Sequence, residues 1–423
     1  MEVQKQTLKN GLRLITAPMP VESVTVMMII GAGSRYETAR IKGISHFSEH
    51  MAFKGTLKRP SAVTISSLID AIGGYFNAAT SKEETVFYAK SASKHLPLVM
   101  DVLADIVLNP KLDRVEIEKE KGVVIEELNM YEDTPIFKIG DYFERLLYPK
   151  SSLGWDVVGE EKTIQALTRE DFVQYRQRLY FPENMLLVVA GGFKSKEVKR
   201  LAENYLGDFK TQGSKPLTQE TFRQTEPQVF LRTKKTDQAH LILGVRGNPL
   251  GHPDRYAEMV LATLLGGGMS SRLFIEVREK RGLAYYIRTE VSHYLDNGYL
   301  ATIAGVDTKR IAQAVKVILG EYQKIVKGNK ISQKELQKAK EFIKGRLILE
   351  LEDSRAVANL FGVQEFFERQ LRTPAEIMAK IDQVSVQDLV RVARQFFTND
   401  RLNLALIGPE QNEANLKKIL RFN

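Results

Sequence analysis

The sequence predicts an α+β protein of two homologous domains, each with a mixed, mostly antiparallel sheet covered by helices. Segments with a strand pattern and segments with a helix pattern are mixed along the 423 residues, a length that suggests two to three domains. Their order is similar in the two halves of the chain, which indicates an internal repeat. A regular strand-helix-strand alternation with a glycine-rich phosphate turn is missing. We therefore expect layers in which helices cover one face of each sheet.

In the first half, Asn10-Gly11 predicts a hairpin turn between two strands, and the apolar run 24–30 predicts a buried strand. Further strands are predicted at 77–80, 84–91 and 185–190. Helices are predicted at 43–54, 60–72, 96–108, 113–131, 136–147, 169–179 and 194–206.

The second half repeats this order. Its predicted strands are 239–245, 284–292, 299–306 and 402–407, and its predicted helices are 254–265, 271–280, 310–326, 333–352 and 410–420. Between the halves, residues 208–227 are rich in Gln, Thr and Lys, include Gly213 and Pro216, and predict a linker. The predicted domains are therefore 1–207 and 228–423.

The composition is that of a soluble globular protein, with 43% hydrophobic and 27% charged residues. The net charge of +9 is spread along the chain, without the basic stripe or module that nucleic-acid binding requires. No apolar run approaches the roughly 20 residues that cross a bilayer, and the N-terminus lacks a signal-peptide pattern. We expect a cytoplasmic protein with neither a nucleic-acid nor a membrane partner. Because there is no Cys, His and carboxylates are the only strong metal ligands.

The stretch His46-Phe47-Ser48-Glu49-His50 is the main functional signal. On a helix, His46 and His50 lie on adjacent turns of one face, with Glu49 beside them. Two imidazoles at this spacing suit Zn²⁺, and a carboxylate that does not bind the metal can act as a base. The order H-x-x-E-H is that of inverted zinc peptidases. The alternative is a chance pair of surface histidines.

A catalytic zinc site needs a third protein ligand. The acidic helix predicted at 113–131 offers Glu120, Glu126 and Glu127. Most acidic residues on a helix only face solvent. Glu120 and Glu127, however, are seven residues apart and share a face, so one could bind the metal while the other supports it.

Together these motifs resemble the pitrilysin family of inverted zinc peptidases, which includes insulin-degrading enzyme and the mitochondrial processing peptidase. The resemblance covers nearly the whole chain. It implies that His46, His50 and Glu127 hold one Zn²⁺ per chain, that Glu49 is the catalytic base, and that Glu120 is the supporting glutamate. The family places its third ligand 76 or 77 residues after the second His, so Glu126 stays as the alternative to Glu127.

Two further motifs match the family. The segment Arg278-Glu-Lys-Arg-Gly-Leu-Ala-Tyr285 matches an Arg/Tyr pair that reaches the substrate, with Arg281 as the alternative to Arg278. Tyr285 would donate a hydrogen bond to the oxyanion, and Arg278 would bind a substrate carbonyl or carboxylate. Asn77, Ala78 and Ala79 match the sheet edge on which a peptide is laid. From composition alone, these segments would be an ordinary helix face, a core tyrosine and a turn.

The resemblance implies a zinc endopeptidase that cleaves short or unfolded polypeptides inside a chamber. Because relatives of the insulin-degrading type have four domains, a two-domain chain is expected to form a homodimer. One alternative is a non-catalytic member that keeps the fold as a scaffold. Another is a zinc hydrolase that acts on a different bond, such as a small-molecule amide.

Overall fold

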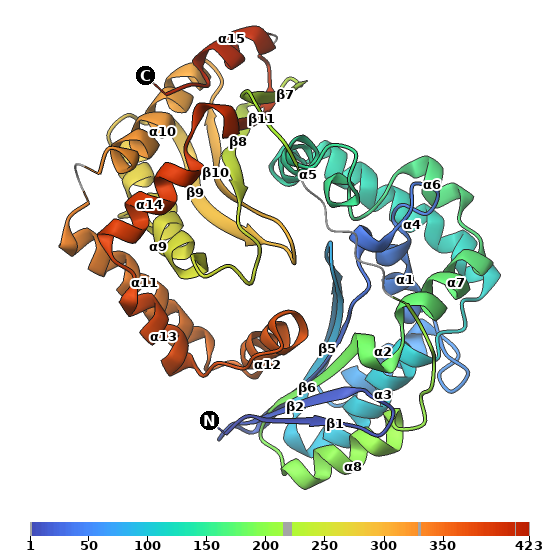
Figure 1. The fold of residues 1–423 in the computed structure, drawn as a ribbon. Coiled ribbons are helices and arrows are strands. Elements are labelled where there is room, and N and C mark those ends of the chain that lie inside the picture. Colours follow the sequence, from blue (N-terminus) through green and yellow to red (C-terminus); the bar gives the residue numbers. More distant parts are fainter. Residues whose placement is uncertain (1, 215–221, 329–330, 411, 423) are drawn as a thin grey trace. The chain divides into compact units, whose positions relative to one another are not determined.

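The computed structural model describes residues 2–214, 222–328, 331–410 and 412–422, and the chain forms two compact units (Figure 1). The first unit contains Met1–Met130, Trp155–Thr218 and Glu350–Leu371. The second contains Tyr131–Gly154, Gln219–Leu349 and Arg372–Asn423. Neither unit is continuous in sequence. The division at 208–227 stays a prediction, because residues 215–221 of that linker lie outside the described residues.

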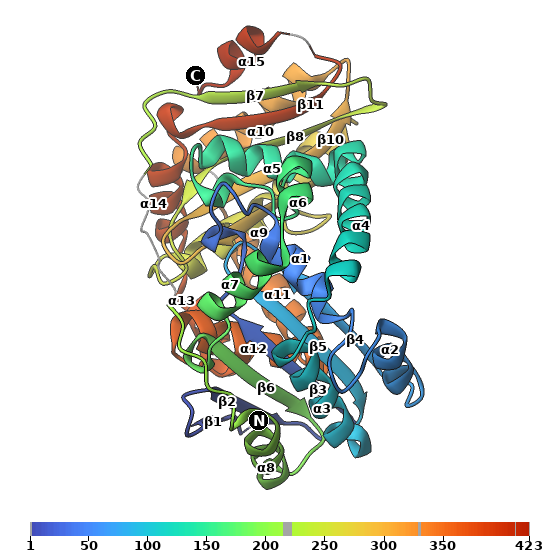
Figure 2. The ribbon, with the colours of Figure 1, turned by 90° about the vertical axis from the view of Figure 1, so that its right-hand side faces the viewer.

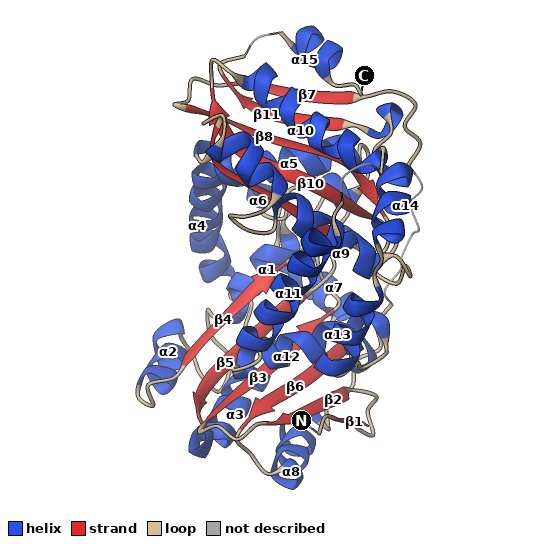
Figure 3. Cartoon of the chain, turned by 90° about the vertical axis from the view of Figure 1, so that its left-hand side faces the viewer, coloured by secondary structure: helices blue, strands red, loops and turns tan. Residues whose placement is uncertain are grey.

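The first unit is built on a six-stranded sheet with the order β1-β2-β6-β3-β5-β4 (Figure 3). Only β2 and β6 pair in parallel, so the expected mixed, mostly antiparallel sheet is confirmed. The predicted Asn10-Gly11 hairpin joins β1 to β2. The strands are β1 Gln4–Thr7, β2 Arg13–Pro18, β3 Ser23–Ile30, β4 Tyr75–Thr80, β5 Thr85–Ala92 and β6 Met185–Gly191.

Both faces of this sheet are apolar at its centre. In β3, Val26 and Met28 pack into a core with helices of the first half, whereas Met27 and Ile29 face a second core. This alternation follows from the two-residue period of a strand. The helices of this part of the chain are α1 Ile44–Ala52, α2 Ala62–Asp70, α3 Leu96–Leu108, α4 Arg114–Asp133, α6 Glu161–Ala166, α7 Arg169–Leu179 and α8 Ser195–Leu206.

The second core is completed by α12 (Ser354–Val363), which comes from the other half of the sequence. Phe361 of α12 is buried in this core with residues of β2, β3 and β6. The helix α12 lies on the face of the sheet opposite α3 (Figure 1). Beyond α12, the buried Glu365 accepts a 3.1 Å hydrogen bond from Arg13 of β2. The expectation of helices on only one face was therefore wrong, because a sheet that is apolar on both faces needs cover on both.

The second unit contains a five-stranded sheet with the order β7-β11-β8-β10-β9. Here β7 and β11 are the parallel pair. The order matches the first sheet without its β1, so the repeat extends to strand topology. The strands are β7 Gln228–Thr233, β8 Gln238–Gly247, β9 Ala284–His293, β10 Gly298–Asp307 and β11 Asn403–Gly408. The helices are α9 Arg255–Gly266, α10 Ile311–Val326, α11 Gln333–Glu350, α13 Pro374–Gln383, α14 Val386–Phe396 and α15 Glu413–Ile419.

One face of this second sheet is covered by a helix from the first half of the sequence, α5 (Pro135–Leu147) (Figure 2). Phe143 and Leu147 of α5 are buried in one cluster with Ile242 of β8 and Ile303 of β10. α5 follows the long helix α4, and α12 follows the long helix α11. Each half of the sequence therefore supplies the equivalent helix to the sheet formed by the other half.

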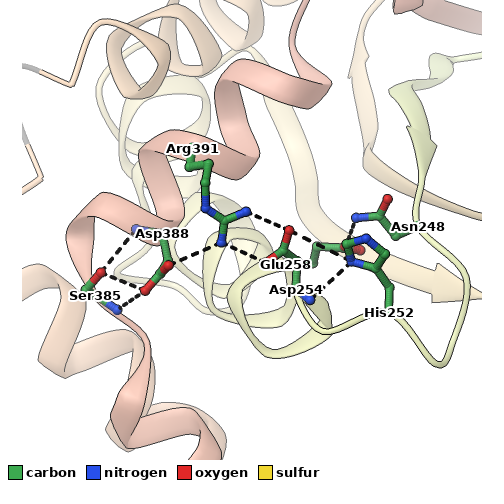
Figure 4. Close-up of polar contacts among 7 residues, drawn as sticks. All are labelled: Asn248, His252, Asp254, Glu258, Ser385, Asp388 and Arg391. Atoms are coloured by element: carbon green, nitrogen blue, oxygen red, sulfur yellow. Dashed lines mark hydrogen bonds and ion pairs between the residues drawn. The ribbon is translucent and has the colours of Figure 1, made fainter.

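A polar network fixes the start of α9 to α14 in the second unit (Figure 4). Arg391 of α14 donates two 2.7 Å hydrogen bonds to the carboxylate of Asp254, which precedes α9. Asp388 and Ser385 form the capping box of α14. On α9 itself, Glu258 accepts a 2.6 Å hydrogen bond from Asn248. A bidentate arginine-carboxylate pair gives a defined geometry, so the network holds the two helix N-termini together.

Among the described helices, none combines the length and the apolar character required to cross a membrane.

Candidate metal centre

The helix that carries the H-x-x-E-H motif is α1, and its first turn is held by a buried carboxylate. Glu37 accepts hydrogen bonds from the backbone N–H groups of Gly43 and Ser45 at 2.8 and 2.9 Å. Burial raises the pKa of Glu37 to about 7, although the bonds from Ser45 and Gly43 lower it. Gly43 has φ +87°, and a Cβ there would lie 2.4 Å from the carbonyl oxygen of Val158. The start of α1 therefore requires glycine.

His46 and His50 lie one turn apart, and their ring centroids are separated by 4.5 Å. The Nε2 atoms of His46 and His50 lie 3.6 and 3.5 Å from the same oxygen, Oε2 of Glu127 on α4. One ligand atom from each of the three residues lies within 4.8 Å of the other two. Within the described parts of the chain, this is the only group of His, Asp or Glu residues with such spacing.

The second carboxylate of α4 fixes the ring of His50. Oε1 of Glu120 lies 2.9 Å from Nδ1 of His50, and Oε2 of Glu120 forms a 2.5 Å ion pair with Lys54. Because an ionised carboxylate only accepts, this contact assigns a proton of His50 to Nδ1, so Nε2 is the nitrogen that would bind a cation. Glu126, the alternative ligand, is exposed and lies outside the group of three.

The two histidines differ in electrostatic environment. Burial and the neighbouring His50 lower the pKa of His46, so its imidazole is neutral. Burial also lowers the pKa of His50, but hydrogen bonds to Glu120 and Glu127 outweigh it and raise the value to about 9. Burial raises the pKa of Glu120, and its contacts with His50 and Lys54 bring it below the ordinary value. A pKa of about 9 means that His50 also holds a proton on Nε2 at neutral pH, and a metal ion bound there would take the place of that proton.

Glu49 lies beside this group without belonging to it. Its side chain is buried, and its Oε2 accepts a 2.5 Å hydrogen bond from the hydroxyl of Thr80, the last residue of β4. Burial raises the pKa of Glu49, whereas the bond from Thr80 lowers it. A carboxylate with a raised pKa next to a cation site is suited to taking up a proton.

The predicted substrate strand is β4, which lies at the edge of the first sheet and pairs with β5 alone. Asn77 and Ala79 are exposed, and Ala78 is half-buried. The backbone N–H of Ala78 donates a 2.8 Å hydrogen bond to the side chain of Asn77. An edge strand with small side chains is a site at which an extended peptide can add.

Arg278 and Tyr285 belong to the second unit, so their contribution to the centre stays a prediction. Arg278 is exposed on a short π-helical turn, Phe274–Glu279, with its guanidinium 4.8 Å from the ring centroid of Phe274. Tyr285 follows the turn near the start of β9 and is 65% exposed. Arg281, the alternative, pairs with Glu276 at 2.6 Å.

Sequence reasoning missed two residues of this region. Lys54 is four residues after His50, so the helical spacing that selected the histidines could also have placed it on their face. Thr80 is two residues after Ala78, on the inward face of β4. The two-residue period of a strand indicates that face, but it does not indicate that α1 lies behind it.

The chain is similar to known peptidases. Residues 14–148 match the family model described as insulinase (peptidase family M16), and residues 166–343 match the model described as the peptidase M16 inactive domain. The "Uncharacterized zinc protease YmxG" of Bacillus subtilis is 38% identical over 411 residues, which are 97% of this chain and 99% of that protein. An uncharacterized zinc protease of Mycobacterium leprae is 36% identical over 99% of this chain and 95% of its own length.

Solved structures agree with these similarities. The crystal structure of a protease from Helicobacter pylori has a TM-score of 0.90 and 27% sequence identity, and the match covers 96% of this chain and 99% of that chain. A structure from Pseudomonas fluorescens, titled peptidase M16 inactive domain, has a TM-score of 0.89 at 18% identity, over 97% of this chain and 98% of that chain. The second match concerns the fold alone.

Proposed function

Because the chain belongs to the M16 (insulinase) family of peptidases, we propose that it is a zinc-dependent endopeptidase that hydrolyses internal bonds of short or unfolded polypeptides. The observation that carries this proposal is the group of His46, His50 and Glu127, whose ligand atoms lie within 4.8 Å of one another. Two imidazole nitrogens and one carboxylate oxygen fit the donor set of a catalytic zinc ion, which keeps a fourth position open.

When bound, Zn²⁺ supplies a Lewis acid that polarises a carbonyl group and makes water a better nucleophile at neutral pH. His46 and His50 would hold it through Nε2, and Glu127 through a carboxylate oxygen. Glu49 accepts a proton from the attacking water and returns it to the leaving amine. Glu120 keeps the ring of His50 in one tautomer and orientation through the 2.9 Å contact with Nδ1.

The substrate would pair with the free edge of β4 as an additional strand. Main-chain hydrogen bonds along residues 77–79 would hold an extended peptide with little dependence on its sequence, which favours unfolded substrates. Tyr285 would donate a hydrogen bond to the oxyanion, and Arg278 would bind a carbonyl or carboxylate of the peptide. The exposure of Tyr285 supports this role, since a core tyrosine would be buried. One zinc ion per chain and a homodimer complete the proposal.

Cleavage of a fluorescence-quenched peptide, with and without a chelator, tests the function. We expect internal cleavage that a chelator abolishes and that added Zn²⁺ restores, with product masses that locate the broken bond. Glu49→Gln should keep zinc and lose at least about 100-fold in kcat, because it removes the base. Full activity of metal-loaded Glu49→Gln would refute the mechanism. Zinc-dependent hydrolysis of a small amide but of no peptide would favour the amidase alternative, and zinc-free protein without hydrolysis would favour the scaffold.

The third ligand has a matched control in its neighbour. Glu127→Gln should reduce the zinc content to well below one ion per chain, because a neutral amide replaces the only carboxylate in the group. Glu126→Gln should leave the zinc content unchanged, because Glu126 is exposed and outside the group. The opposite result would assign the metal to Glu126.

A further inference from the structure

The last residue of the edge strand contacts the side chain that we assign as the catalytic base. Along β4, the side chains of residues 75, 77 and 79 are exposed, and those of 76, 78 and 80 point inward. Phe76 and Ala78 pack against the first core, and the hydroxyl of Thr80 reaches Glu49 on α1 at 2.5 Å. The strand that offers its edge to a peptide therefore touches the base through its inward face.

The direction of this hydrogen bond follows from counting protons. Thr80 also lies 3.3 Å from the hydroxyl of Thr85, its partner on β5. Thr85 donates its own proton to the carbonyl oxygen of Ala32 at 2.5 Å. An ionised carboxylate has no proton to give. The Thr80 proton is therefore directed at Oε2 of Glu49.

This bond fixes one carboxylate oxygen and leaves the other available. Among the described residues, Thr80 is the only one from which Glu49 accepts a hydrogen bond. With Oε2 engaged, Oε1 is free to accept a proton from water. Once Oε1 is protonated, Oε2 can still accept from Thr80, so the carboxyl group keeps its orientation while the proton moves on. A short hydrogen bond to a charged acceptor is strong enough to restrict a side-chain rotamer.

We propose that Thr80 is a positioning residue that holds the carboxylate of Glu49 in its reactive orientation and links it to the substrate-binding edge of β4. This role rests on the proposed peptidase function. It differs from metal binding, because Thr80 contacts none of the three candidate ligands through a described hydrogen bond. It also differs from substrate binding, because the hydroxyl points to α1 and away from the exposed face of the strand.

The test is Thr80→Val, which keeps the shape of the side chain and removes the hydroxyl. We expect kcat for peptide cleavage to fall about 10- to 100-fold, because a misplaced catalytic group loses this much rate. KM should change less than about twofold, since the strand edge is intact, and zinc content and thermal unfolding should match the wild type. Thr80→Ser, which restores the hydroxyl, should recover most of the activity.

Thr85→Val is the matched control, since it removes the neighbouring hydroxyl and leaves the bond from Thr80 to Glu49. It should retain wild-type kcat. Three results would overturn the positioning role. They are a wild-type kcat in Thr80→Val, a loss of zinc in that variant, and a Thr80→Ser variant that is as slow as Thr80→Val.

A crystal structure of Thr80→Val provides a readout that does not depend on activity. We expect the Glu49 carboxylate to leave the position that it has in the wild type, with α1 and β4 unchanged. If the carboxylate keeps its place, the positioning role is wrong. If the wild type cleaves no peptide, the proposed function fails, and this structural comparison still decides whether Thr80 orients Glu49.

Discussion

The buried Glu258 of α9 makes the stability of the protein depend on pH. Its side chain is completely buried, Oε1 accepts from Asn248, and Oε2 has no hydrogen-bond partner. Burial raises its pKa from 4.5 to about 7, although the bond from Asn248 lowers it. The folded protein therefore favours the protonated acid, and Glu258→Gln keeps an uncharged side chain of the same shape with an oxygen for Asn248.

The sign follows from comparing the two states. Below pH 4.5 the carboxyl group is protonated in both the folded and the unfolded state, so the folded state carries no cost from a buried charge at Glu258. Between pH 4.5 and 7 the unfolded chain ionises while the folded protein keeps the proton, so stability falls as pH rises and stays lower above pH 7. The difference between a pKa of 4.5 and one of about 7 corresponds to about 3 kcal/mol. Glu258→Gln lacks this loss.

Urea unfolding of the wild type and of Glu258→Gln at pH 4.5 and pH 8 measures the effect. On going from pH 4.5 to pH 8, the free energy of unfolding of the variant should rise relative to that of the wild type by up to about 3 kcal/mol. The pKa of Glu37 is also raised to about 7, but Glu37 is present in both proteins and cancels. Glu352→Gln, at an exposed glutamate between α11 and α12, is the control and should show no such gain. A difference between variant and wild type that is the same at both pH values would refute the argument.

Three further changes test the structure. Glu120→Gln should weaken zinc binding about 10- to 100-fold, because the ring of His50 loses its carboxylate; competition with a chelator measures this, and unchanged affinity would contradict the supporting role. Arg13→Ala should lower the free energy of unfolding by about 1–3 kcal/mol, because the buried Glu365 loses its buried partner and keeps only the partly exposed Lys5 and Arg369; a loss below about 0.5 kcal/mol would show that the pair is unimportant. Gly43→Ala should cost more than about 1 kcal/mol at φ +87° and lower the zinc content, because α1 must shift away from Val158; a variant with wild-type stability and zinc content would argue against this constraint.

Local patterns in the sequence predicted most of the secondary structure. The range 169–179 coincides with α7, and the repeated order of elements corresponds to two sheets of matching topology. Residues 353–401 received no assignment, although they form α12, α13 and α14. The predicted helix 271–280 contains the π-helical turn Phe274–Glu279. Periodicity detects a helical face, but it does not distinguish the hydrogen-bond patterns of α- and π-helices.

Local sequence patterns also predicted only some of the residues of the candidate metal centre. His46, Glu49 and His50 follow from helical spacing within five residues. The resemblance gave Glu127 with Glu126 as the alternative. Local periodicity alone does not separate the two, because adjacent helix residues point about 100° apart and the position of α4 decides which of them faces α1. Thr80 depends on a contact between a strand and a helix 31 residues earlier in the chain, which no local pattern contains.

The exchange of α5 and α12 has a consequence for the order in which the protein can be completed during synthesis. The first sheet has all its strands once Gly191 has been made, yet the apolar face that includes Met27 and Ile29 waits for α12, which follows nearly the whole second half. In turn, the buried side of α5 waits for β11, which begins at Asn403. The core between β3 and the helices of the first half can form from first-half residues alone. The core on the α12 face of the first sheet and the cluster around α5 are completed only after most of the second half has been made.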